Sequence, residues 1–138
     1  MSHEPEAVVR RLWEAINARD YARLAGAIAE QCAWVSMPLV HEYRGPKAMV
    51  DGLRAFHEAF PDGHGEILHL HVAGEGTVVV EWRMSGTNTG PLNGDAPTGR
   101  SFTRRGCSVA TVRGGKIVAY RDYFDRQTLT DQILPPTR

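Results

Sequence analysis

The hydrophobic period changes once along the chain, and this change limits the folds that are possible. Before Gly65, apolar residues such as Val8, Leu12 and Ile16 recur every three to four positions, which places them on one face of a helix. From Gly65 onward, β-branched and aromatic residues alternate with polar ones, which is the pattern of strands. Helices followed by an antiparallel sheet indicate an α+β fold in which helices cover one face of the sheet.

Individual elements follow from these periods and from the glycine and proline positions. Three helices are expected, over Glu4 to Ala18, Tyr21 to Glu30 with Asp20 as N-cap, and Lys47 to Ala59 after Gly45-Pro46. Ala33 to Tyr43, which contains Pro38, is expected to be a short extended segment and a loop. Four strands are expected, over Glu66 to Ala73, Thr77 to Thr87, Ser101 to Arg113 and Lys116 to Phe124. Short glycine turns would join them in an antiparallel meander, and the polar segment 88–100 would edge a pocket.

The composition of the chain limits the kinds of molecule that it is expected to bind. The chain has 138 residues, 42% of them hydrophobic, and we expect one domain over residues 1–138. Its 16 basic and 16 acidic residues give a net charge of zero, so neither nucleic acid nor an anionic membrane is an expected partner. The polar N-terminus does not resemble a signal peptide, and no apolar run suits a membrane helix, so we expect a cytoplasmic location. Cys32 and Cys107 are expected to be buried packing residues.

Asp122 is the residue that the strand pattern singles out. Alternation on the last strand places it in one row with Val118, Tyr120 and Phe124, and such an apolar row should face the helices. A carboxylate there would be partly desolvated, which raises its pKa toward the range that is useful for proton transfer. The alternative is a structural carboxylate that pairs with Arg83 or Arg104 on a neighbouring strand.

Histidines and aromatic residues offer further candidates. His69 and His71 share a strand face and could bind a metal only with a third ligand such as His41 or Glu81, so we expect structural histidines and no metal site. Trp82 lies in a row with Val78, Val80 and Met84, where core packing and a pocket wall are equally compatible with the pattern. There is neither a nucleophile elbow nor a phosphate-binding glycine motif.

Three stretches carry a family resemblance. They are residues 45–48 (GPKA), 86–100 (GTNTGPLNGDAPTGR) and 115–129 (GKIVAYRDYFDRQTL). The glycine-rich loop followed by the Arg-Asp motif resembles the SnoaL-like polyketide cyclases of the nuclear transport factor 2-like superfamily, over nearly the whole chain. The resemblance implies a cone-shaped barrel, in which three N-terminal helices pack in a strongly curved, mostly antiparallel sheet. It also implies a homodimer in antibiotic biosynthesis that uses no metal or organic cofactor.

The resemblance also implies a function. Asp122 would be the general acid/base of an intramolecular aldol-type ring closure, or of related lyase or isomerase chemistry, on a small hydrophobic carbonyl or aromatic substrate. The expected pocket residues are Trp13, Trp34, Phe56, Trp82, Met84, Ser108, Tyr120 and Phe124. At the positions of polar pocket partners in the cyclases this chain has Trp34, Gly106 and Ser108. The substrate of any relative therefore does not carry over.

Other functions remain open at the level of sequence. The ketosteroid isomerase residues align with Leu12, the region of Ser36 and Met37, and Ser108, which disfavours steroid isomerisation. An epoxide-hydrolase-like enzyme would need an arginine and two carboxylates around a water, and the sequence offers no second carboxylate that should face Asp122. Hydrolysis by a water held between Asp122 and Tyr43 or another polar group would need a polar pocket floor. A non-catalytic binding or interaction module on the same scaffold is the main rival. The second sheet face, with Val79, Val109, Ala119 and Tyr123, is apolar enough to form a dimer interface.

Overall fold

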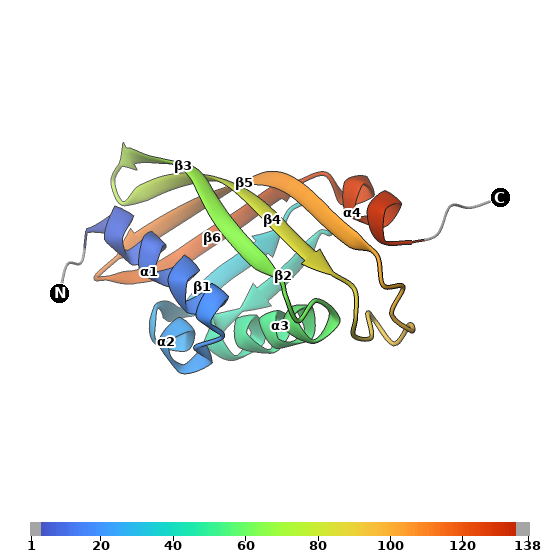
Figure 1. The fold of residues 1–138 in the computed structure, drawn as a ribbon. Helices are drawn as coiled ribbons and strands as arrows, with labels where there is room; N and C mark the ends of the chain where they lie inside the picture. The colour runs from blue at the N-terminus through green and yellow to red at the C-terminus, as the bar shows by residue number, and fades with distance from the viewer. Residues whose placement is uncertain (1–3, 135–138) are drawn as a thin grey trace.

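The computed structural model describes residues 4–134, which form one sheet of six strands and four helices (Figure 1). The helices are α1 (Pro5–Ala18), α2 (Tyr21–Gly26), α3 (Gly45–Ala59) and α4 (Arg126–Ile133). The strands are β1 (Ile28–Ser36), β2 (His41–Arg44), β3 (His64–Gly74), β4 (Thr77–Thr87), β5 (Ser101–Arg113) and β6 (Lys116–Phe124). No helix of the described residues is both long and apolar enough to cross a membrane.

The strand order β2-β1-β6-β5-β4-β3 confirms the antiparallel meander of the last four strands. β1 adds to the end of this meander by pairing in parallel with β6, and β2 then pairs antiparallel with β1. Within residues 4–134, β2 and β3 do not pair with each other, so the sheet is curved but not closed. The expected α+β fold is therefore confirmed, with an open sheet in place of a complete barrel.

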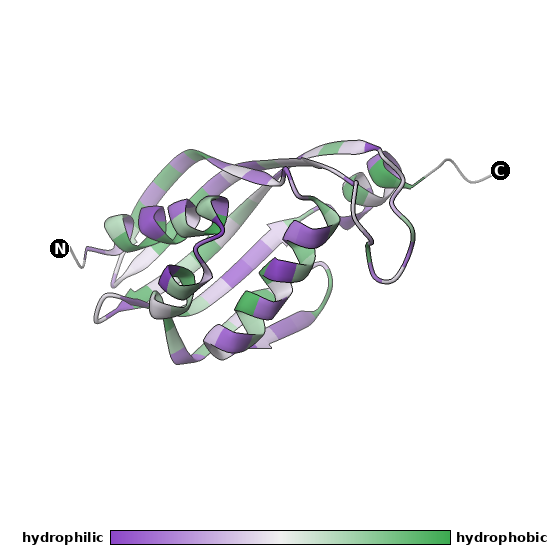
Figure 2. Ribbon diagram, turned by 60° about the horizontal axis from the view of Figure 1, so that its bottom comes forward, coloured by the Kyte–Doolittle hydropathy of each residue, from purple (hydrophilic) through white to green (hydrophobic). Residues whose placement is uncertain are grey.

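Local signals account for where the helices begin. Pro5 and Pro46 lie in the first turns of α1 and α3, where proline costs no hydrogen bond. The side chain of Asp20 accepts a hydrogen bond from the backbone N–H of Arg23 at 3.1 Å, which confirms Asp20 as the N-cap of α2. The three N-terminal helices lie together on one side of the sheet, and Figure 2 shows α1 and α3 carrying both polar and apolar faces.

Two elements differ from expectation. The second helix ends at Gly26 instead of Glu30, because the next residues enter β1, where the backbone N–H of Ile117 donates to the carbonyl of Ala27 at 2.8 Å. The expected loop from Ala33 to Tyr43 therefore contains the second half of β1, a turn and most of β2. The helix α4 was not expected; it begins after Asp125, whose side chain caps it.

The core lies between the helices and the inner face of the sheet. Two residues that were expected to be buried, Val118 and Cys107, are not. A register shift between Thr111 and Val112 makes Ile117 the fully buried residue of β6 at that level, whereas Val118 is only partly buried. Cys32 is buried as expected, but Cys107 is partly exposed because it lies on the outer face of β5. Both cysteines are free thiols.

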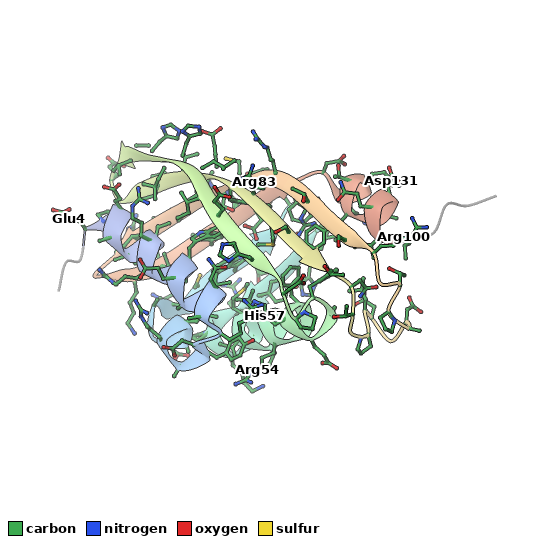
Figure 3. The ribbon with its side chains drawn as sticks, viewed as in Figure 1. Glu4, Arg54, His57, Arg83, Arg100 and Asp131 are labelled. Carbon is green, nitrogen blue, oxygen red and sulfur yellow. The ribbon has the colours of Figure 1, made fainter. Side chains whose placement is uncertain are left out.

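The buried His57 of α3 predicts a loss of stability in acid (Figure 3). Its Nδ1 lies 2.6 Å from the Tyr21 hydroxyl, and burial, with the nearby Arg19 charge, lowers the pKa of His57 from 6.5 to about 4. The folded state thus favours the neutral ring; this contribution is complete above pH 6.5 and is lost as the pH falls toward 4. We expect the free energy of unfolding to fall by roughly 1–3 kcal/mol over this range.

The measurement is urea unfolding at a series of pH values. His57→Gln should flatten the curve between pH 6.5 and 4, whereas His64→Gln, at an exposed histidine, should leave it unchanged. A His57→Gln curve as steep as that of the natural protein would contradict this account.

Candidate functional site

Asp122 lies on the inner face of β6, in the middle of the sheet. Its Cα pairs with that of Ser36 on β1 and with that of Ser108 on β5, so both neighbouring strands present a side chain beside it. Ser36 and Ser108 are buried, and Asp122 itself is partly buried. Tyr120 and Asp122 thus lie on the inner face as expected, whereas Val118 of the same expected row is only partly buried.

Two side chains hold the carboxylate in a defined orientation. Trp34 on β1 donates its indole N–H to Oδ2 at 2.8 Å, and the Ser108 hydroxyl donates to Oδ1 at 2.6 Å. Trp82 on β4 donates its indole N–H to Ser108 Oγ at 2.8 Å. Because Trp82 can only donate, the single hydroxyl hydrogen of Ser108 remains available for Asp122. A chain of hydrogen bonds therefore runs from β4 through β5 to β6.

Gly106 gives Trp82 the room that this chain needs. A Cβ at position 106 would collide with the six-membered ring of the Trp82 indole, which lies directly over the Gly106 backbone. The side chain of Trp82 is itself buried, so its ring could yield only by displacing its neighbours. The missing side chain at position 106 is thus part of how the site is built.

Next to Asp122, aromatic rings fill the interior between the helices and the sheet. Tyr120 stacks on Trp34 with ring centroids 3.8 Å apart, and its hydroxyl accepts a hydrogen bond from the indole N–H of Trp13 at 3.1 Å. Burial raises the pKa of the Tyr120 hydroxyl, and the Asp122 charge adds to this effect. Tyr120 therefore stays protonated, and it positions the two indoles.

Burial also raises the pKa of Asp122 above 3.8. The hydrogen bonds from Ser108 and Trp34 and the positive charge of Arg104 oppose this shift, in that order. Desolvation outweighs them, so the carboxyl group accepts and releases a proton at a higher pH than an ordinary aspartate. This is the direction that a general acid/base requires.

The expected pocket residues divide into two groups by exposure. Five are at most 5% exposed and pack against one another: Trp13, Trp34, Trp82, Ser108 and Tyr120. The other three, Phe56, Met84 and Phe124, are partly exposed and lie with Asp122 toward the other end of the inner face. Asp122 therefore stands where a filled interior meets accessible side chains.

Of the two possible arginine partners, the structure places Arg104 near Asp122. Arg83 instead forms an ion pair with Glu66 at 2.7 Å on the exposed surface (Figure 3). Arg104 is partly buried on the inner face of β5, and its guanidinium carbon lies 4.1 Å from the centroid of the Phe124 ring. Among the ion pairs of residues 4–134, none joins Arg104 to Asp122, so the charges attract without contact.

Sequence reasoning had not placed two further residues in the site. Ser36 is buried beside Asp122 at the end of β1, where the alternation of Cys32, Trp34 and Ser36 could have indicated it. Tyr43, which was considered only as a possible water-holding group, pairs with Trp34 across β1 and β2. Burial raises the pKa of Tyr43, and the negative charge of Asp122 raises it further.

His41, His69 and His71 do not form one cluster. His71 contacts the Glu81 carboxylate at 2.9 Å on an exposed part of β3 and β4, and His69 stacks beside it. His41 lies on β2, at the other edge of the sheet. Among the residues described, no group of three or more histidine, cysteine, aspartate or glutamate side chains is arranged to hold a metal ion.

Two surface hollows lie away from Asp122. One, of about 470 Å³, is bounded by α2 and α3 and includes Tyr21 and Arg54; the other, of about 750 Å³, lies where β1 meets the β5–β6 turn. Neither is lined by residues of the hydrogen-bonded chain around Asp122. Because a hollow alone carries no chemistry, we base the site on Asp122 and its partners.

Comparison with known families decides the identity of the fold. The SnoaL-like polyketide cyclase family matches residues 6–133. The chain belongs to this family. No curated protein matches the sequence.

Solved structures of similar SnoaL-like and NTF2-like proteins share the fold. An NTF2-like protein from Burkholderia thailandensis is 28% identical, with a TM-score of 0.83 over 98% of this chain and 100% of that one. IdmH from Streptomyces antibioticus, a polyketide cyclase candidate, is 23% identical with a TM-score of 0.81 over 94% of this chain and 97% of its own. AclR from Streptomyces galilaeus, a hydroxylase candidate, is 22% identical with a TM-score of 0.79 over 93% of each chain. The different activities suggested for IdmH and AclR show that this fold alone does not decide the reaction.

Proposed function

We propose that this SnoaL-like protein catalyses cofactor-independent, aldol-type ring closure or a related isomerisation of a small hydrophobic carbonyl compound, with Asp122 as general acid/base. The observation that carries the proposal is the Asp122 carboxylate itself. It is partly desolvated, and Trp34 and Ser108 each hold one of its oxygens. Each oxygen keeps lone-pair capacity that can face a substrate.

The proposed reaction needs only proton transfers and one carbon–carbon bond. The Asp122 carboxylate removes a proton from a carbon next to a carbonyl group, and the electron pair of the broken C–H bond forms an enolate. The enolate carbon attacks a second carbonyl group of the same molecule, which closes the ring and leaves an alkoxide. The protonated Asp122 then returns its proton to the alkoxide. Confinement of both carbonyl groups in one pocket would supply much of the rate enhancement.

Side chains at the accessible end suit such a substrate. Phe56, Met84 and Phe124 are apolar and partly exposed, and they come from α3, β4 and β6. The five buried residues would then orient Asp122 without touching the substrate. A role in antibiotic biosynthesis is part of the proposal, as the resemblance to polyketide cyclases suggests.

The tightly filled interior favours one rival, a non-catalytic binding or interaction module. Trp13, Tyr120 and Ser108 are at most 5% exposed, so side chains fill the interior next to Asp122. The epoxide-hydrolase alternative has less support, since the groups that hydrogen-bond to Asp122 or act on its charge are Ser108, Trp34 and Arg104, none of them a carboxylate.

Hydrogen–deuterium exchange separates the cyclase from the binding module. 2-Tetralone, an aromatic ketone with an activated C–H bond, is incubated with the protein in deuterium oxide, and NMR follows deuterium incorporation. A catalyst that uses Asp122 should accelerate exchange, whereas a binding module should bind the ketone without accelerating it.

We also propose a homodimer that forms through the outer face of the sheet. Tyr123 is 42% exposed there, and Val109 and Ala119 on the same face are partly exposed. Light scattering coupled to size-exclusion chromatography should give twice the chain mass of 15.3 kDa. Tyr123→Arg should shift the protein to the monomer, because a charge would replace an apolar contact, whereas Val72→Arg on the exposed end of β3 should not. A monomer in the natural protein would refute the dimer.

A further inference from the structure

Arg104 has a buried donor without an acceptor. Its Nε is inaccessible to solvent and has no hydrogen-bond partner among the described residues. Buried N–H groups in proteins are almost always paired, and an unpaired one on a charged group is costly. An acceptor from a bound molecule would relieve this cost.

Aromatic rings hold the guanidinium in place. Its central carbon lies 4.1 Å from the ring centroid of Phe124, 5.7 Å from that of Phe102 and 6.0 Å from that of Trp82. Such contacts stabilise the cation but do not satisfy its N–H groups. Burial lowers the pKa of Arg104 to about 10, and the Asp122 charge works against this decrease, so the side chain remains charged at neutral pH.

A second unpaired polar atom lies on the other side of Asp122. Ser36 Oγ is buried without a hydrogen-bond partner among residues 4–134, and Ser36 is the β1 neighbour of Asp122 in the sheet register. Arg104 lies on β5, the opposite neighbour of β6, on the same inner face. One unpaired group thus comes from each of the two strands that neighbour β6, and a ligand with polar oxygens bound near Asp122 could satisfy them.

We propose that Arg104 binds an oxyanion of the substrate, a carboxylate or enolate that is conjugated to an aromatic ring. The ring would lie against Phe124 and Met84, and the oxyanion would accept hydrogen bonds from the guanidinium N–H groups. An enolate that forms when Asp122 removes a proton would be stabilised in the same way, because its negative charge develops beside a fixed cation. The inference rests on the proposed function for this last step only, since binding of the oxyanion requires no turnover.

A pair of probes tests this inference by binding alone. 1-Hydroxy-2-naphthoate carries the carboxylate, and its methyl ester has nearly the same shape without the charge. Titration calorimetry with the natural protein should show at least tenfold tighter binding of the acid than of the ester, on the order expected for a charged hydrogen bond. Arg104→Met should remove this preference by weakening the acid at least tenfold while changing the ester little.

Arg83→Met is the matched control, because it removes an arginine of the adjacent strand that faces solvent and pairs with Glu66. It should bind both probes as the natural protein does. If Arg104→Met does not fold, NMR of the natural protein decides: the Nε–H resonance of Arg104 should shift with the acid and not with the ester.

Several results would overturn the inference. They are equal affinity of the natural protein for acid and ester, no binding of either, or a folded Arg104→Met variant that still prefers the acid. Failure of the proposed catalytic function has a different signature. In that case Asp122→Asn would leave deuterium exchange unchanged, while the dependence of acid binding on Arg104 would persist.

Discussion

Asp122→Asn is expected to slow deuterium exchange into 2-tetralone by about 10²- to 10⁴-fold, the usual contribution of a general acid/base. The amide oxygen can still accept the hydrogen bond from Trp34, but the amide group cannot take up a proton from carbon. The amide nitrogen would face Ser108, whose hydroxyl hydrogen then lacks its acceptor. The variant therefore removes the chemistry at the cost of one hydrogen bond.

The pH dependence of deuterium exchange gives an independent check on the role of Asp122. Because the pKa of Asp122 is raised above 3.8, exchange by the natural protein should decline as the pH falls through a value higher than that of an ordinary aspartate. The protonation of Asp122 also changes the free energy of unfolding, and the raised pKa fixes the direction of this change. A raised pKa means that the protonated carboxyl favours folding; this contribution is complete below pH 3.8 and is lost as the pH rises through the folded-state pKa. Asp122→Asn should thus gain stability relative to the natural protein as the pH rises.

NMR measures the exchange, and urea unfolding measures the stability. Asp131→Asn, at an exposed carboxylate of α4, serves as the control and should leave both unchanged (Figure 3). A folded Asp122→Asn variant with full exchange activity would exclude Asp122 from the mechanism.

Gly106→Ala is expected to destabilise the fold by about 1–3 kcal/mol, the usual cost of overpacking a core. The new methyl group would collide with the buried Trp82 ring, and a displaced ring would no longer donate to Ser108. Loss of that bond frees the Ser108 hydroxyl to rotate, so the orientation of Asp122 should become less defined. Deuterium exchange should therefore fall together with stability.

Gly26→Ala is the matched control, since a Cβ at that position in α2 meets no atom within 4 Å. It should be neutral or slightly stabilising, because alanine favours helix more than glycine does. Urea midpoints measure the loss of stability, and tryptophan fluorescence reports the displacement of the Trp82 ring. An unchanged midpoint and spectrum in Gly106→Ala would show that the interior can absorb the methyl group.

Local patterns were sufficient for the meander but not for the strand that completes the sheet. β4, β5 and β6 have the expected bounds, because alternation and glycine turns encode hairpins locally. β1 was partly assigned to a helix because Ile28 continues the helical spacing of Leu24. What decides β1 is its parallel pairing with β6, nearly ninety residues later, which no local pattern contains.

The site was also predictable only in part, because local alternation places single side chains but does not contain contacts between distant segments. Alternation placed Asp122 inside, and the expected rise of its pKa has the right direction. Alternation could not choose between Arg83 and Arg104; the pairing of Arg83 with Glu66 and the stacking of Arg104 on Phe124 are tertiary contacts. The close packing of Trp13 and Tyr120 in the interior likewise depends on contacts between distant segments.

The parallel pairing of β1 with β6 also determines when the site can form. Trp34 and Asp122 are 88 residues apart, and Trp13 and Tyr120 are 107 apart, so the hydrogen bonds between them close long loops of the chain. Contacts at such separation slow folding, because the entropy of loop closure is lost before the contacts form. During synthesis the first helices and β1 would emerge well before β6, so β1 could not form its pairing with β6 until the last strand had been made. The carboxylate of Asp122 and the indole that orients it would meet only when nearly the whole chain has been made.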